Sequence, residues 1–263
     1  MSLVKDKYPI LEYDRSKKAI IEPNRSKKKK FPEFCVITFF GEVLENYLKT
    51  KKNKIIGIYR SEMKPFPVYE VNFKGLKMCL IQAVVGSGSI AMMTEFLIGC
   101  GVKYLICSGC CGVLKDIPSG DVIIPIKALR DEGASYHYLP PQRDISINKM
   151  AINAIKAALN KNKIQYIECK TWTTDALYRE TKEMIKYRTE EGCEVVEMEC
   201  ATMASIAKYR KIVYGQLLYS GDIVIHDKKY DDRGWYKNSN AREKLFYLSM
   251  ETIKELYKKK SIE

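Results

Sequence analysis

Two carboxylates, separated by a single residue, follow an apolar run in Glu197-Met198-Glu199. At the end of a strand, side chains two positions apart point to the same side, so both acids would face one site. Such a pair could act as acid and base, or bind two vicinal hydroxyl groups with both oxygens. One acid could instead be a buried structural acceptor, which is the commoner fate of a lone Glu at a strand end.

A third acid, Asp222, follows the apolar run of residues 212–220 in Ser220-Gly-Asp222. A carboxyl partly removed from water at the end of a strand can keep a raised pKa and serve as a general acid. The structural alternative is an aspartate that caps the start of a helix. Position alone does not decide between the two.

A short Gly-Ser loop, Gly86-Ser87-Gly88-Ser89, separates a predicted strand from a predicted helix. Its backbone N–H groups and the helix N-terminus can bind an anion. The spacing matches neither full nucleotide-binding fingerprint, and a tight turn is an equal alternative. The polar and aromatic stretch from Arg130 to Tyr138, which includes His137, is a fourth candidate because few surface loops need so many specific side chains.

The elements that must position these residues alternate between strands and helices. Short apolar runs predict strands at about 34–40, 54–60, 68–73, 78–85, 104–108, 122–126, 166–169, 194–198 and 212–220. Helical patterns cover about 86–100, 147–159, 180–191, 200–210 and 241–259. The alternation predicts one α/β domain over residues 31–263, with a mixed sheet covered by helices on both faces. In such sheets ligands bind at the carboxyl ends of strands, where the four candidates lie.

Charge is concentrated at the start of the chain. The net charge is +13 over 263 residues, and residues 1–30 hold ten Lys and Arg against four Asp and Glu. We interpret these thirty residues as a basic extension, and the run at 25–30 as a solvated loop in preference to a nucleic-acid site. No apolar run approaches the roughly 20 residues of a membrane span, and the N-terminus lacks the apolar core of a signal peptide. We therefore expect a cytoplasmic protein.

The nine cysteines show no disulfide framework, and most lie inside apolar runs as small core residues. Cys107, Cys110 and Cys111 form one cluster. A metal site needs more ligands at suitable spacing, and the chain has only two histidines, so no metal is expected.

Taken together, these segments resemble the nucleoside phosphorylases of the purine nucleoside phosphorylase and uridine phosphorylase type over about residues 34–256. The resemblance rests on the segments 86–88, 108–112, 120–125, 130–138, 173–180 and 197–199, and on Asp222. It implies a three-layer α/β/α domain that forms homodimers, often trimers of dimers, with active sites shared across the dimer. It also implies cleavage of a nucleoside N-glycosidic bond by phosphate, with no other cofactor.

The same resemblance implies roles for individual residues. Glu199 would hold the ribose hydroxyls with Glu197 beside it, Met198 would pack against the sugar, and Leu177 and Tyr178 would line the base pocket. Asp222 would protonate the departing purine. The anion site would draw on Gly86, Ser87, Gly88, Cys107, Cys110 and, from the neighbouring subunit, Lys64, with Arg130 and His137 elsewhere in the pocket.

The departures from the family pattern concern phosphate. The G-D-P-x-R loop expected after the first strand is absent from residues 38–43, Cys107 replaces a second arginine, and Cys110 replaces a Ser or Thr. Each charge-assisted hydrogen bond contributes about 1.5–3 kcal/mol, so phosphate should bind weakly. Three readings follow: a phosphorylase with an atypical phosphate site, a nucleosidase that uses water, or a non-catalytic nucleoside-binding protein. We favour the first, an enzyme that cleaves a purine nucleoside by phosphorolysis at an atypical phosphate site.

Overall fold

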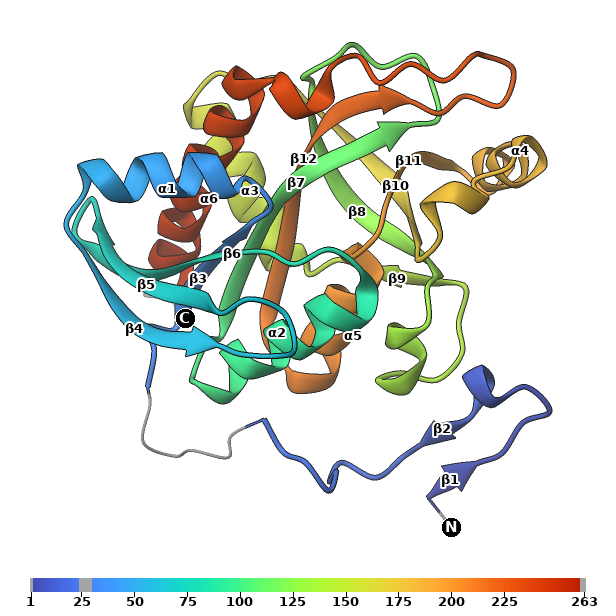
Figure 1. Ribbon diagram of the computed structural model, residues 1–263, viewed down its shortest axis with the longest axis horizontal. Coiled ribbons are helices and arrows are strands. Elements are labelled where there is room, and N and C mark those ends of the chain that lie inside the picture. The colour runs from blue at the N-terminus through green and yellow to red at the C-terminus, as the bar shows by residue number, and fades with distance from the viewer. Residues whose placement is uncertain (1, 24–29, 261–263) are drawn as a thin grey trace.

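A ten-stranded mixed sheet forms the centre of the molecule in the computed structural model, which describes residues 2–23 and 30–260 (Figure 1). Its strands are β3 (Phe34–Thr38), β4 (Asn53–Tyr59), β5 (Phe66–Phe73), β6 (Leu76–Gln82), β7 (Tyr104–Val113), β8 (Val122–Asp131), β9 (Asp144–Ser146), β10 (Tyr166–Thr174), β11 (Cys193–Glu197) and β12 (Val213–Ile223). The helices are α1 (Gly41–Thr50), α2 (Ser87–Gly99), α3 (Lys149–Lys161), α4 (Lys182–Glu190), α5 (Cys200–Arg210) and α6 (Ser239–Lys260). The predicted α/β class and single mixed sheet are confirmed.

The strand order is β11-β10-β8-β12-β7-β3-β6-β5-β4, and β9 pairs with β8. β11 also pairs antiparallel with β7, through Val195 opposite Val113 and Val196 opposite Gly112. The strands β7, β12, β8, β10 and β11 therefore close on themselves, while β4 forms the other end of the sheet.

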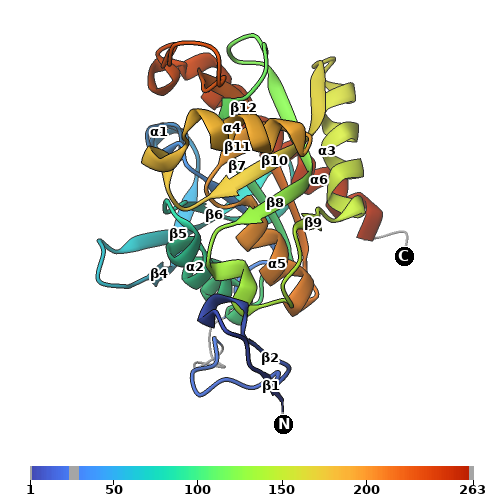
Figure 2. The same ribbon diagram turned by 90° about the vertical axis from the view of Figure 1, so that its right-hand side faces the viewer.

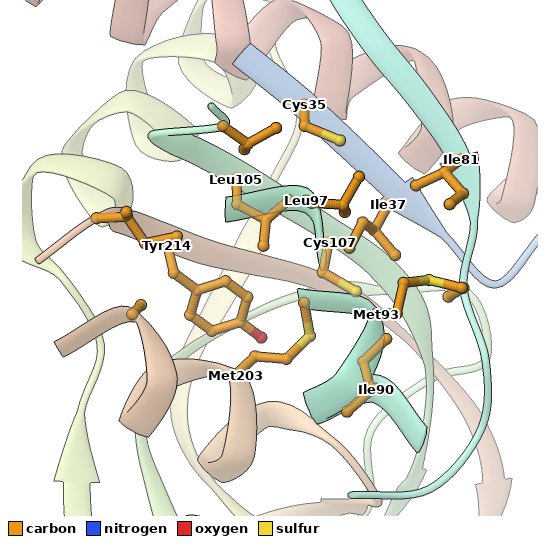
Figure 3. Packing of buried hydrophobic residues seen from close by; sticks show 14 of the residues in the cluster. Cys35, Ile37, Ile81, Ile90, Met93, Leu97, Leu105, Cys107, Met203 and Tyr214 are labelled. Atoms are coloured by element: carbon orange, nitrogen blue, oxygen red, sulfur yellow. The ribbon is translucent and has the colours of Figure 1, made fainter. Parts of the chain in front are cut away.

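Helices cover both faces of this sheet (Figures 1 and 2). α2 and α5 pack on one face over a core that includes Ile37, Met93 and Met203, and α1, α3 and α6 cover the other. The close view of the first core shows Cys107 among these side chains (Figure 3). The layers predicted from the alternating pattern are thus the layers observed.

Two local predictions need correction. The helix expected from residue 180 begins at Lys182, because the Thr181 hydroxyl caps it by accepting from the Met184 N–H (3.3 Å). The preceding residues form the short 3-10 helix η3 (Leu177–Arg179). Residues 38–43 are described above only as an altered loop, but residues 41–43 form the first turn of α1, whose Val43 and Leu44 are buried.

The N-terminal residues 2–23 lie along the end of the domain beside α5 (Figures 1 and 2). They contain a two-stranded hairpin, β1 (Leu3–Val4) and β2 (Tyr13–Asp14). The Lys17 ammonium lies 4.2 Å from the ring centroid of Tyr209, whose hydroxyl donates to the Ser16 carbonyl. The predicted basic loop at 25–30 lies outside the described residues except for Lys30. None of the helices in the described ranges is long and apolar enough to cross a membrane.

Candidate active site

Glu197 is a buried structural acceptor between β10 and α5. Its Oε1 accepts from the hydroxyls of Thr171 (3.2 Å) and Thr173 (2.5 Å), and its Oε2 accepts from the N–H groups of Glu199 (2.8 Å) and Cys200 (2.7 Å). Four donors occupy this carboxylate and hold the first turn of α5 against the sheet. Of the two roles left open for the paired acids, Glu197 has the structural one, and the expectation that it contacts ribose finds no support.

Glu199 is the buried acid that faces a neighbouring loop. It precedes α5, and its Oε1 accepts from the Gly86 N–H at 2.6 Å, where α2 begins. A Cβ placed on Gly86 or Gly88 would meet no atom within 4 Å, so open space borders this contact. Burial, with the nearby Glu197 charge, raises the pKa of Glu199 to about 8. Half-buried Met198 lies between the two acids in the chain.

The Gly-Ser loop is tied to a carboxylate that the sequence analysis did not select. The Ser87 hydroxyl donates to Asp175 Oδ1, and the Gly133 N–H donates to Asp175 Oδ2 at 2.8 Å. Because its hydrogen bond goes to an acid, Ser87 has no free proton to offer an anion in this arrangement. Asp175 directly follows strand β10. An acid directly after a strand is the signal that identified Asp222, so the same signal could have found Asp175.

Asp222 lies near the end of β12, partly buried beside β7. A Cβ on Gly112 would lie 3.4 Å from its Oδ1. Burial raises the pKa of Asp222, while Arg233 and a hydrogen bond from Tyr230 oppose that rise. Arg233 itself donates to the carbonyls of Gly221 (2.5 Å) and Ile117 (2.8 Å), so it also fixes the backbone next to the acid. Asp222 is not a helix cap, since it lies within a strand.

Leu177 and Tyr178, the expected base contacts, lie on η3 and point to solvent. Leu177 is 49% exposed and Tyr178 95% exposed. Two residues further on, Glu180 turns inward, and burial together with the Asp222 charge raises its pKa to about 7. Glu180 is the last residue of the segment 173–180 on which the family resemblance rests, and no role was predicted for it from the sequence.

The anion candidates do not form a cationic site within one chain. Cys107 is fully buried in the core, where burial holds the pKa of its thiol well above the usual range, so it is neutral and out of reach of a bound anion. Cys110 packs against Gly221, and burial raises the pKa of its thiol to about 12. The Lys64 ammonium lies over the Phe66 ring, 5.4 Å from the centroid, on the exposed loop between β4 and β5.

The guanidinium of Arg242, on α6, is close enough to Cys110 to oppose the rise in the pKa of its thiol. Both oxygens of Glu42 accept from Arg242, one of them at 2.9 Å. The guanidinium also lies 4.8 Å from the ring centroid of Phe40. A bidentate carboxylate neutralises this charge, so Arg242 does not replace the missing phosphate arginines as the side chains stand.

Arg130 lies near the end of strand β8, and His137 ends the short 3-10 helix η2 (Ala134–His137) in the loop that follows β8. The Arg130 guanidinium donates to the Ser135 hydroxyl and to the carbonyls of Leu139 and Pro140 at 2.8–3.2 Å, and it stacks on Tyr136. These bonds shape the loop, which argues against the predicted role of Arg130 in the pocket.

His137 instead lines a cavity of about 1160 Å³ between the N-terminal segment and α2. Within residues 2–23 and 30–260, no three His, Cys, Asp or Glu side chains are grouped so that they could hold a metal ion.

Comparison with known proteins identifies the family. A model of the phosphorylase superfamily matches residues 33–246. The purine nucleoside phosphorylase of Plasmodium vivax is 28% identical over 203 residues, which cover 72% of this chain and 79% of the relative.

Among solved structures, purine nucleoside phosphorylase from Toxoplasma gondii in complex with immucillin-H aligns with a TM-score of 0.74 at 19% identity, over 90% of this chain and 94% of that one. AMP nucleosidase from Bacteroides thetaiotaomicron aligns with a TM-score of 0.70 at 24% identity, over 88% and 91%. At these identities the structures show a shared fold. With the family match spanning most of the chain, the protein belongs to the phosphorylase superfamily as an enzyme of the nucleoside phosphorylase type.

Proposed function

We propose that this enzyme cleaves the N-glycosidic bond of a purine nucleoside, with Glu199 at the ribose and Asp222 at the base. The observation that carries the proposal is the buried Glu199 carboxyl beside open space at Gly86 and Gly88. In its ionised form, the Glu199 carboxyl group can accept from both ribose hydroxyls and oppose the positive charge that the sugar develops as the C–N bond breaks.

The base requires a proton at the same moment. Cleavage leaves the electron pair of the glycosidic bond on the base, and a carboxylic acid near N7 lowers the barrier by protonating it. Asp222 is partly buried and its pKa is raised, so it keeps a proton at higher pH than an exposed aspartate. N7 exists in purines and not in pyrimidines, and the Plasmodium vivax relative is named for purine nucleosides.

The nucleophile at C1′ is phosphate, held weakly. Its binding rests on the N–H groups of Ser87 and Gly88 and on Lys64 of the partner subunit, because the Gly86 N–H already donates to Glu199. Cys107 and Cys110 are neutral thiols, and Glu42 engages Arg242. A lysine is a point charge without a guanidinium fork and grips phosphate less specifically. This scheme requires a homodimer, in which each active site draws on both subunits. A hexamer made of three such dimers meets the same requirement. Nine free cysteines agree with a reducing cytoplasm.

Hydrolysis is the second candidate. It is favoured because, in the part of the chain that the structure describes, Glu42 engages Arg242 and Cys107 stands where the family has an arginine. Water would then attack C1′, and the structural neighbour named AMP nucleosidase shares the fold.

Inosine incubated with increasing phosphate separates the two reactions. Phosphorolysis at a weak site yields ribose 1-phosphate only at high phosphate, whereas hydrolysis yields free ribose at every phosphate concentration. Ribose 1-phosphate formed with micromolar saturation would contradict the weak site. If neither sugar product appears from any purine nucleoside, the catalytic proposal fails.

A further inference from the structure

Asp175 joins three segments of the chain at the Gly-Ser loop. It directly follows β10, its Oδ1 accepts from the Ser87 hydroxyl at the start of α2, and its Oδ2 accepts from the Gly133 N–H (2.8 Å) just before η2. Both oxygens are therefore used as acceptors, as they are in an ionised carboxyl group. Asp175 is exposed, so its charge faces the solvent from which an anion would arrive.

The donors of the Gly-Ser loop meet acids on two sides. The Gly86 N–H donates to Glu199 Oε1 (2.6 Å), and the Ser87 hydroxyl donates to Asp175. The N–H groups of Ser87 and Gly88 begin α2 and have no acceptor within the helix. Within residues 2–23 and 30–260, no Lys or Arg forms an ion pair with either acid. A loop suited to a phosphate dianion would instead have cations beside it.

A fixed negative charge beside these N–H groups lowers their affinity for an anion in two ways. It repels phosphate directly, and the repulsion is stronger where water is partly excluded, as at buried Ser87. It also engages the Ser87 proton, which a phosphate oxygen would otherwise accept. A neutral nucleophile such as water experiences no such repulsion.

We propose that Asp175 is a specificity-determining residue that weakens the binding of phosphate at the Gly-Ser loop relative to a neutral nucleophile such as water. The inference rests on the anion site of the function proposed above, and it names the residue that makes phosphate binding weak there. Asp175 acts through the Ser87 hydroxyl and through its own charge, and it takes no part in breaking the C–N bond.

The test is Asp175→Asn, with inorganic phosphate as the ligand. The Asn carbonyl can still accept from the Gly133 N–H, while its NH₂ group donates to the Ser87 oxygen and frees the Ser87 proton. We expect the Kd of phosphate from calorimetry, and the KM of phosphate in inosine cleavage, to fall about tenfold or more. This gain should shrink as salt is added, because part of it is a repulsion removed. The KM of inosine should change less than about 3-fold.

Asp175→Glu and Glu183→Gln are the matched controls. The first keeps the charge on a longer side chain, and the second removes an exposed acid of α4 with the same change in net charge. Neither should tighten phosphate binding. Ser87→Ala combined with Asp175→Asn should lose part of the gain, because the freed hydroxyl is then absent. Thermal melting shows whether each variant is folded, and Asp175→Ser makes the same comparison if Asp175→Asn is not.

A purely structural role of Asp175 predicts the opposite sign, because a loosened loop would raise the Kd of phosphate. An unchanged or raised Kd in Asp175→Asn, or an equal gain in Glu183→Gln, would overturn the proposal. Tighter phosphate binding by Asp175→Asn in a protein that cleaves no nucleoside would refute the proposed function and leave the role of Asp175 standing. Inosine cleavage with unaltered phosphate affinity would refute the role of Asp175 and leave the cleavage reaction standing.

Discussion

Replacement of Glu197 by alanine tests whether the two neighbouring acids have different roles. The change removes the acceptor of two hydroxyls and of the N–H groups of Glu199 and Cys200, all at the buried start of α5. The hydroxyls can rotate toward other acceptors, and Thr171 already lies 3.5 Å from the Val195 carbonyl. The two N–H groups have no such freedom.

A buried donor left without a partner costs about 1–3 kcal/mol, so Glu197→Ala should lower the free energy of unfolding by about 3–5 kcal/mol. For a chain of this size that corresponds to a fall in Tm of about 6–20 °C. Urea denaturation and thermal melting measure both quantities. Glu197→Gln, which keeps one acceptor oxygen, should lose less.

Glu199→Ala is the matched comparison. It removes one hydrogen bond to Gly86, but it also removes a buried carboxyl whose pKa is held at about 8, so the stability change should stay within about 1 kcal/mol. Calorimetry should instead show a nucleoside Kd raised about tenfold or more, with the Kd of the free base nearly unchanged. Equal destabilisation by both variants, or lost nucleoside binding in a fully stable Glu197→Ala protein, would refute these assignments.

Two further outcomes are expected. Asp222→Asn should lower kcat on inosine about 10²–10⁴-fold with the nucleoside Kd preserved, measured by steady-state kinetics and calorimetry, and unchanged turnover would exclude Asp222 as the acid. Because the folded chain holds the Glu199 proton up to about pH 8, whereas the unfolded chain releases it near the ordinary value of 4.5, stability should fall as pH rises between these values. Urea midpoints across that range should decline less steeply in Glu199→Gln, and parallel declines would contradict the buried, protonated carboxyl.

The apolar runs predicted the sheet because strands covered on both faces are apolar throughout, as in Phe34–Thr38. The same reasoning overlooked α1. The apolar residues of this helix recur at helical spacing, at Val43, Leu44, Tyr47 and Leu48. This spacing predicts a helix, but residues 38–43 were compared only with the phosphate loop of the family.

Side-chain direction explains the misplaced site residues. The predicted strand places Cys107 next to the Gly-rich turn. Only the packing of α2 and α5 against β7 shows that the Cys107 side chain lies in the core. Likewise, the Arg130 guanidinium donates to carbonyls of the loop that follows its strand, and the path of that loop depends on bonds between distant residues such as Asp175 and Gly133. The partial burial of Glu180 has the same origin, since residue types alone would bury Leu177 and Tyr178 and leave Glu180 in water.

The closure of β11 onto β7 bears on solubility. An end strand offers unpaired N–H and C=O groups to which another chain can add, and such addition starts aggregation. With one end of the sheet closed and β9 only three residues long, β4 is the long strand left open in the described part of the chain. Exposed Lys54 lies on it and Lys51 and Lys52 immediately precede it, so any copy that approached edge to edge would meet its own positive charge. These three lysines thus protect the long edge that the described part of the sheet leaves open to stacking.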